Sequence, residues 1–277
     1  MSVSEYNLVS SEKIGSVLRV TLDRPKRRNA LSEQMVSELL KIFSIAEQDT
    51  STNALILRGS GKSFCSGYDV SFSESDPSVS PSPIEKMQSV IQDNRLFDCV
   101  MRSPVPTIAQ IHGHCLAAGT DLAFCCDMII CSKDARVGYP AVRSVGVPVT
   151  HMWLYHMGPQ WAKRLLFTGD SITGEKAAEL GLALEAVDPG QLDSYVLELA
   201  TRISWINRDV LIANKSVINQ GLELMGRAML QETAVARNVL IRFTPAAHRF
   251  WETIEKEGVK QAITSRDSQF SSQDPIT

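Results

Sequence analysis

The chain has 277 residues, of which 44% are hydrophobic and 21% charged, a composition typical of a globular protein and not of a disordered or fibrous one. Its 28 basic and 31 acidic residues give a net charge of −3, so no broad positive field exists for nucleic acid or an anionic membrane. No apolar run reaches the roughly 18 residues of a membrane span, and residues 1–11 lack the features of a secretory signal. The sequence therefore predicts a cytoplasmic protein with no nucleic-acid and no membrane partner.

The first sixty residues predict a strand, a helix and a second strand. Residues 16–23 distribute their side chains onto two different faces, as a strand does. Ser32 can cap a helix in which apolar residues recur at helical spacing up to Ala46. The short apolar run at 54–57, ended by Gly59, is typical of a buried strand.

A segment rich in serine and proline follows. Residues 71–83 contain six serines and three prolines, and this composition predicts a mobile loop because it offers little apolar surface to bury. Ser82 and Glu85 have the spacing of a capping box, so we expect a helix to begin there and to reach about Met101.

Short strands and helices then alternate up to about residue 150. The apolar runs 106–111 and 127–131 are typical of strands, and buried strands joined to helices by short connections predict an α/β fold with parallel pairing. Further along, helical patterns dominate, at 162–167, 174–180, 192–203, 210–218, 223–241 and 246–257. We therefore expect two parts, an α/β core of residues 1–202 and a helical C-terminal region of residues 203–277.

The six cysteines form no C-x-x-C pair, and in a reducing compartment they are expected to be small buried hydrophobic residues. His112, His114 and Cys115 lie close together in sequence, but no second cluster follows at a spacing that would complete four ligands. We therefore expect no metal site.

Two strand exits punctuated by glycine, residues 64–69 and 113–121, are the strongest candidates for a site. Position 56 is isoleucine where a phosphate-binding P-loop ending at Gly61 needs glycine, and no G-x-S-x-G elbow is present. Small residues at a strand exit let a ligand approach the main chain, and the free N–H groups at a helix start concentrate about half a positive charge. Two converging N–H groups would form an oxyanion hole, whereas the alternative is that the small residues only allow close helix packing.

Several ordered blocks of the sequence resemble the enoyl-CoA hydratase/isomerase family, also called crotonases. They are residues 23–31, 57–70, 111–121, 138–140, 146–148, 166–169 and 177–182. The resemblance implies a ClpP/crotonase fold, a repeated β-β-α superhelix with a helical C-terminal region that packs in homotrimers or dimers of trimers. It also implies coenzyme A thioesters as substrates, with coenzyme A as part of the substrate, no covalently bound cofactor and no metal.

The resemblance also assigns roles to particular positions. The backbone N–H groups of Tyr68 and Ala118 would form the oxyanion hole. The coenzyme A path would involve Lys26, Arg28, Ser66, Asp69, Val70, Arg266 and Phe270. The substrate pocket would include Pro140, Ala141 and Arg143.

The acid/base positions depart from the hydratase pattern. Two glutamates flank one water in the hydratases that this sequence resembles, and the corresponding residues here are Asp121 and Ala141. Asp121 can still transfer a proton, although its alternative role is that of a charge in the first turn of a helix. Ala141 cannot, so a replacement is expected from His151, or from Thr150, Arg143 or His114; His151 could alternatively be a helix-face residue.

These residues predict an enoyl-CoA hydratase that uses Asp121 and an enolate held in the oxyanion hole. Two other functions stay open because of Ala141. One is a CoA-thioester isomerase or carbon–carbon hydrolase that uses His151 with Asp121, and the other is an acyl-CoA-binding member without catalysis.

Overall fold

A computed structural model describes residues 8–70, 82–270 and 275–277 of the chain. Residues 71–81, which hold most of the predicted serine-rich loop, lie outside these ranges. The predicted capping box is confirmed: Ser82 Oγ accepts a hydrogen bond from the Glu85 N–H, and Glu85 Oε2 accepts one from the Ser82 N–H at 2.7 Å. The helix that it starts, α2, spans Pro83–Met101 as expected.

The described residues form two sheets, the larger with the strand order β1-β2-β3-β5-β7-β10. Its strands are β1 (Val9–Ile14), β2 (Val17–Leu22), β3 (Ala54–Gly59), β5 (Thr107–Ile111), β7 (Met128–Ser132) and β10 (Glu185–Val187). All neighbours pair in parallel except β1 and β2. The strands predicted at 16–23, 54–57, 106–111 and 127–131 are therefore confirmed, and the two edge strands β1 and β10 are additions.

The smaller sheet has the order β4-β6-β8-β9. Its strands are β4 (Ser63–Cys65), β6 (His114–Leu116), β8 (Arg136–Gly138) and β9 (Ser171–Thr173), and only the β8–β9 pair is antiparallel. Each strand has three residues, which is too short for a recognisable alternation of side chains. At the far end of the chain, the Ile276 carbonyl accepts a hydrogen bond from the Thr173 N–H, so the C-terminus returns to this sheet.

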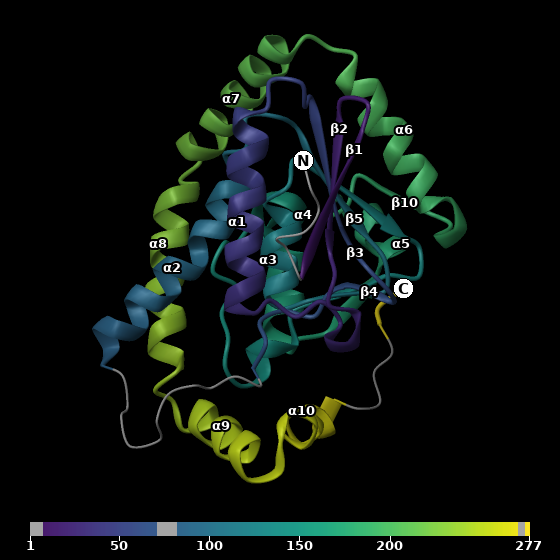
Figure 1. Ribbon diagram of the computed structural model, residues 1–277. Coiled ribbons are helices and arrows are strands. Elements are labelled where there is room, and N and C mark those ends of the chain that lie inside the picture. The colour runs from purple at the N-terminus through teal and green to yellow at the C-terminus, as the bar shows by residue number, and fades with distance from the viewer. Residues whose placement is uncertain (1–7, 71–81, 271–274) are drawn as a thin grey trace.

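Helices cover both faces of the larger sheet (Figure 1). On one face lie α1 (Glu33–Gln48), α2, α3 (Ala118–Phe124) and α4 (Trp153–Thr168), and α6 (Leu192–Ser204) covers the other. Strand β3 serves both interfaces, since Leu55 and Leu57 belong to the main core whereas Ala54 and Ile56 pack against α6. The short helix α5 (Gly174–Glu179) links the two sheets between β9 and β10. This arrangement is an α/β fold with mostly parallel strands and a helical C-terminal region, as expected from the sequence.

The C-terminal region consists of α7 (Arg208–Leu224), α8 (Arg227–Ile241), α9 (Pro245–Glu257) and α10 (Val259–Asp267). The continuous helix predicted over 223–241 is wrong, because Gly226 adopts a left-handed φ of 87° that ends one helix and starts the next. Lys215 anchors α7 to the core: its Nζ lies 2.7 Å from Asp127 Oδ2 and 3.2 Å from the Val105 carbonyl oxygen.

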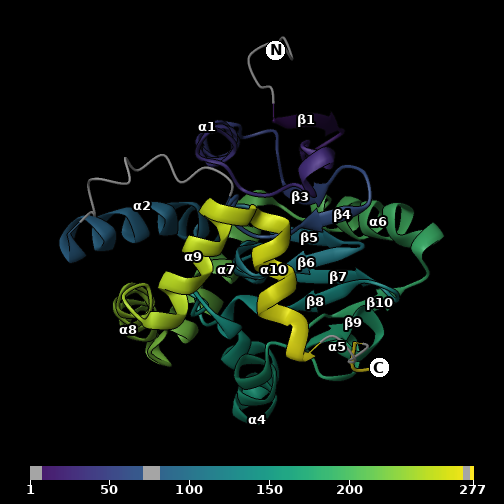
Figure 2. The same cartoon turned by 90° about the horizontal axis from the view of Figure 1, so that it is seen from below.

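The pair α9–α10 lies across the ends of the strands, as Figure 2 shows in yellow. No helix in the described ranges combines the length and the apolar character that a bilayer crossing requires.

Candidate active site

A cavity of about 2900 Å³ lies between the α/β core and the α9–α10 pair. Core residues from both glycine-rich strand exits line one wall, and residues of α9 and α10 such as Trp251 and Thr264 line the other. The fold therefore brings together segments that are about 200 residues apart in sequence. All the predicted coenzyme A and substrate-pocket positions line this cavity, namely Lys26, Arg28, Ser66, Asp69, Val70, Pro140, Ala141, Arg143, Arg266 and Phe270.

The two strand exits meet at Gly67 and Ala118. Gly67 has a φ of 102°, and a Cβ atom placed on it would lie 2.9 Å from the Ala117 Cβ and 3.3 Å from the Ala118 backbone N. Ala118 is the first residue of α3, a position at which the N–H has no acceptor within the helix. Because Tyr68 follows Gly67 and also lines the cavity, the main chain of Tyr68 and that of Ala118 face the same space.

Backbone hydrogen bonds fix both exits. Gly67 accepts a hydrogen bond from the Leu31 N–H at 2.8 Å, and Leu31 in turn accepts one from the Asp69 N–H at 2.9 Å. On the other exit, Ala117 holds a positive φ of 50° that is rare for a residue with a side chain, and its N–H donates to Gly138 at 3.0 Å. The exits are therefore rigid, as a site that binds a developing charge requires.

Asp121 lies on α3, three residues beyond Ala118, and only 1% of it is exposed. One carboxylate oxygen, Oδ1, accepts two hydrogen bonds from Thr150, one from its N–H at 3.0 Å and one from its hydroxyl at 2.7 Å. Burial raises the pKa of Asp121 from 3.8 to about 6, although the bonds from Thr150 and weaker interactions with Tyr139 and Val149 act to lower it. A carboxyl group with such a pKa can both accept and return a proton near neutral pH.

An acid/base residue is expected to face the substrate, but the Asp121 side chain does not face the cavity. Its side chain is not among the residues that line the cavity, whereas Ala118 on the same helix is. The second carboxylate oxygen, Oδ2, is buried without a partner at normal hydrogen-bond distance in the described part of the chain. The carboxyl group is therefore behind the wall of the cavity.

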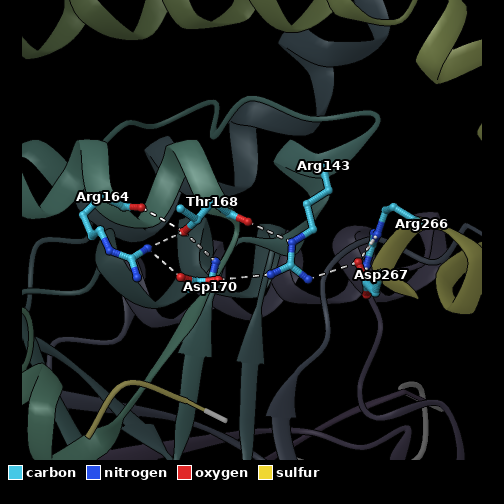
Figure 3. Close-up of polar contacts among 6 residues, drawn as sticks. All are labelled: Arg143, Arg164, Thr168, Asp170, Arg266 and Asp267. Carbon is cyan, nitrogen blue, oxygen red and sulfur yellow. Dashed lines mark hydrogen bonds and ion pairs between the residues drawn. The ribbon is translucent and has the colours of Figure 1, made fainter. Parts of the chain in front are cut away.

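Ala141 lies in a short 3-10 helix, Pro140–Arg143, and its methyl group faces the cavity and Gly146. Arg143, two residues on, is committed to structural contacts (Figure 3). Its guanidinium donates to the Thr168 carbonyl at 2.9 Å and reaches Asp170 and Asp267 at 3.3 Å each. It also lies 4.0 Å from the centre of the Phe270 ring. Arg143 therefore joins α10 to the core, and these contacts do not favour it as the missing acid/base group.

The histidines predicted as replacements lie in different places. His151 precedes α4 with a φ of 49°, is not among the residues that line the cavity, and has a pKa lowered by burial. The alternative that placed it on a helix face is wrong, because α4 begins two residues later. His114 lines the cavity, with its Nδ1 3.4 Å from Ser63 Oγ, and burial together with Arg28 and Arg136 lowers its pKa.

Several of the residues at the coenzyme A positions already have protein partners. Asp69 accepts a hydrogen bond from Arg24 at 2.5 Å, and Arg266 donates two to Asp267 at 2.8 and 2.7 Å. Lys26 lies within the short 3-10 helix Pro25–Arg27, and Arg28 ends it with a left-handed φ of 49°; both line the cavity. The cations are thus gathered locally on a chain of net negative charge.

The sequence matches the family model described as enoyl-CoA hydratase/isomerase over residues 12–271. The chain belongs to the enoyl-CoA hydratase/isomerase family. It is 32% identical over 249 residues to a putative enoyl-CoA hydratase, EchA13, of Mycobacterium tuberculosis, with 80% of this chain and 76% of the relative covered. It is also 28% identical over 271 residues to a crotonyl-CoA hydratase of Syntrophomonas wolfei, with 96% and 99% covered.

A crystal structure of an enoyl-CoA hydratase from Mycobacterium smegmatis superimposes with a TM-score of 0.92 at 33% identity, covering 99% of this chain and 98% of the other. Since enzymes of the enoyl-CoA hydratase/isomerase family act on acyl-CoA thioesters, the cavity is a candidate site for such a thioester. Among the described residues, no group of three or more His, Cys, Asp or Glu side chains is placed to hold a metal ion.

One residue of this site was given no role from the sequence. Tyr139 lines the cavity, only 5% of it is exposed, and its hydroxyl interacts with the Asp121 carboxyl. It lies inside the family block 138–140, which is a signal that the sequence does contain. No pattern in the neighbouring residues, however, indicates that the side chain interacts with Asp121. Tyr139 directly follows β8, which pairs with β6, and β6 contacts α3, so only the tertiary structure brings the two residues together.

Proposed function

We propose that this chain adds water across the 2,3 double bond of an enoyl-CoA thioester. The observation that carries the proposal is the meeting of Gly67 and Ala118 beside Asp121, a buried carboxyl group whose pKa is about 6. Hydration of an enoyl thioester needs a site for the negative charge that develops on the carbonyl oxygen and a group that moves protons. Ala118 and Asp121 both belong to the short helix α3.

The N–H groups of Tyr68 and Ala118 would hold the enolate oxygen. Both are main-chain donors, so the alanine at position 118 still supplies an N–H and its methyl group only narrows the pocket. Loss of one such donor typically lowers the rate by about 10²- to 10³-fold. Asp121 would hold the proton that is taken from water and then given to the α-carbon. A single carboxyl group in this role replaces the pair expected for a two-glutamate hydratase, since position 141 is alanine.

Lys26 and Arg28 would bind the phosphates of coenzyme A at the cavity edge, and Arg266 and Phe270 of α10 would close over the nucleotide. Coenzyme A is thus part of the substrate, and neither a covalently bound cofactor nor a metal takes part in the proposed reaction. A net charge of −3 does not oppose this binding, because these cations lie near the ligand and distant charges are screened within about 10 Å.

The hydration of crotonyl-CoA, and of enoyl-CoA thioesters with longer chains, tests this proposal. We expect the absorbance of the conjugated enone to fall at a rate far above that in buffer, and the product to be the 3-hydroxyacyl thioester. Acyl-CoA that binds tightly but is not turned over by any member of the series would instead favour the non-catalytic alternative.

Isomerisation is the second candidate function, and Ala141 favours it. Moving a double bond from the 3,4 to the 2,3 position takes a proton from one carbon and returns it to another, which a single carboxyl group can do. A 3-enoyl-CoA that gains conjugation in the presence of the enzyme, without subsequent hydration, would support the isomerase and contradict the hydratase. The carbon–carbon hydrolase stays a further alternative; it uses His151 with Asp121, and neither of these residues is among those that line the cavity.

We further propose that the chain assembles as a homotrimer or a dimer of trimers. Large apolar side chains are exposed along α7 and α8 and in the loop before α7, at Trp205, Val217, Ile218, Leu224, Met225 and Met229. Leu224, the most exposed of them, shows 81% of its surface, and large apolar side chains exposed in such numbers in one region favour a protein interface. Sedimentation of the purified protein would test the assembly, and a monomer at micromolar concentration would contradict it. The cytoplasmic location stays a prediction of the sequence.

A further inference from the structure

Tyr139 lines the cavity, and Asp121 lies behind the cavity wall. Asp121 is 1% exposed and is not among the residues that line the cavity, whereas Tyr139 is one of them and its hydroxyl interacts with the carboxyl group. A carboxyl group behind the wall cannot touch a substrate without a rearrangement. Any proton that Asp121 exchanges with the substrate therefore needs a group between them.

The local backbone places the Tyr139 ring beside the oxyanion donors. Gly138, its neighbour, pairs with Leu116 in the small sheet and accepts the Ala117 N–H at 3.0 Å. Gly146 leaves room for the ring, because a Cβ atom at that position would lie 3.3 Å from Tyr139 Cε1. Asp121 is three residues beyond Ala118 on α3 and so lies on the same side of the helix. Tyr139 therefore follows a strand residue that contacts the start of α3, the helix that carries Asp121.

The Tyr139 hydroxyl is held only weakly by its hydrogen-bond acceptor on Val147. Its contact with the Val147 carbonyl oxygen is 3.5 Å, the limit for a hydrogen bond, and that oxygen already accepts one from Asn238 Nδ2 at 2.7 Å. Burial is the main cause that raises the pKa of Tyr139, and its interaction with the Asp121 carboxyl raises it further, whereas the same interaction lowers the pKa of Asp121, as expected when a phenol lies beside a carboxylate. The hydroxyl is therefore close enough to the carboxyl group to interact with it.

We propose that Tyr139 is the catalytic residue that touches the substrate, and that Asp121 exchanges protons with the substrate only through the Tyr139 hydroxyl. The Tyr139 phenol would then act as the second proton-transfer group, which the alanine at position 141 cannot supply. The relay rests on the proposed function, because it needs a substrate that takes up a proton at the α-carbon.

The relay accounts for every atom of hydration. The oxygen of water bonds to the β-carbon while the double-bond electrons move toward the thioester carbonyl. The water gives one proton to the Tyr139 oxygen, and the original Tyr139 proton passes to the Asp121 carboxylate. In the second step this proton returns to the Tyr139 oxygen as the phenol gives its own proton to the α-carbon. Water has then been added, the carbonyl is restored, and Asp121 is again a carboxylate.

The test compares Tyr139→Phe with Asp121→Asn in two assays. The first is hydration of crotonyl-CoA, and the second is exchange of the α-protons of butyryl-CoA in deuterium oxide, which needs proton transfer but no water addition. We expect each variant to lower both rates by about 10²- to 10³-fold, with the dissociation constant for butyryl-CoA within about threefold of the wild type. The double variant should be no slower than the single variants, because residues that act as one unit are not additive.

Tyr155→Phe is the matched control. It removes a phenol hydroxyl that donates to the Met225 carbonyl oxygen at 3.3 Å, and Tyr155 is not among the residues that line the cavity, so both rates should stay at the wild-type level. Normal exchange in Tyr139→Phe, with loss in Asp121→Asn, would overturn the relay and leave the proposed function standing. A wild-type protein that exchanges α-protons but does not hydrate would overturn the hydratase, and loss of exchange in Tyr139→Phe would still support the relay. A wild-type protein that does neither would overturn both.

Discussion

Thr150 donates both its N–H and its hydroxyl to the same oxygen of Asp121, at 3.0 and 2.7 Å. The two residues are 29 positions apart and belong to different segments of the wall, one on α3 and the other just before α4. Thr150 therefore sets which way the carboxyl group points and how strongly its negative charge is stabilised. Four expectations follow from this geometry and from the contacts around it.

Replacing Thr150 by valine keeps the volume of the side chain but removes one of the two hydrogen bonds. Because both bonds lower the pKa of Asp121, the pKa should rise. A hydrogen bond to a charged group contributes about 1.5 kcal/mol or more, which corresponds to roughly one pH unit. The acidic limb of the plot of kcat/KM against pH should move up by about that amount. Thr150→Ser, which keeps the hydroxyl, should leave the limb in place, and an unshifted limb in Thr150→Val would contradict the assignment.

The raised pKa of Asp121 also predicts how stability depends on pH. Between 3.8 and about 6 the folded protein holds a proton at this site that the unfolded chain releases, so stability should fall as the pH rises through this window. Asp121→Asn removes the cost of the buried charge and should raise the free energy of unfolding at pH 8 by up to about 3 kcal/mol. The gain should vanish below about pH 4.

Thermal unfolding at pH 8 and pH 4 measures this difference. The surface variant Asp188→Asn, which loses only an exposed pair with Lys133, should change the melting temperature little at either pH. An Asp121→Asn protein that melts below the wild type at pH 8 would show that the buried charge does not destabilise the fold.

Gly67→Ala should impair catalysis while leaving the protein folded. The new Cβ would meet the Ala117 Cβ at 2.9 Å and the Ala118 N at 3.3 Å, and it would strain a φ of 102°. If these backbone atoms form the oxyanion hole, we expect kcat to fall by about 10²- to 10³-fold. Gly15→Ala introduces the same kind of strain, at a φ of 59°, in open space and should keep full activity. Equal activity of the two variants would exclude this part of the wall from the site.

Arg143→Met should loosen the α9–α10 pair. The substitution removes the contacts to Asp267 and Phe270 that tie the C-terminal helices to the core, and each charged hydrogen bond contributes about 1.5–3 kcal/mol. We expect deuterium exchange in α10 to become roughly tenfold faster or more, with a higher KM for acyl-CoA.

Arg164→Met is the matched control for this link. Arg164 also donates to Asp170, at 2.5 Å, but none of its hydrogen bonds reaches α10 (Figure 3). Its loss should leave exchange in α10 at the wild-type rate. Equal exchange in both arginine variants would mean that other contacts hold the helices.

The sequence by itself determined the long elements and the family. Helical spacing in residues 33–48, the capping box at Ser82 and the apolar runs of β3, β5 and β7 are local patterns, so they can be recognised without knowing the neighbours. The family blocks likewise contain residues that line the cavity, including Tyr68, Ala118 and five of the predicted coenzyme A positions, Lys26, Arg28, Ser66, Asp69 and Val70. In contrast, the three-residue strands of the small sheet escaped detection, because so short a run has no readable period.

Only the tertiary structure decided what the individual groups can do. Asp121 is of a residue type that can transfer protons, but it is buried and bonded to Thr150, behind the wall of the cavity. Arg143 is of a type that can bind an anion, but its guanidinium already contacts Asp267 and Phe270. Tyr139 gains its proposed role from a carboxyl group 18 positions away on another element. Exposure, pKa and hydrogen-bond partners depend on segments that meet only on folding, and no local pattern encodes those distances.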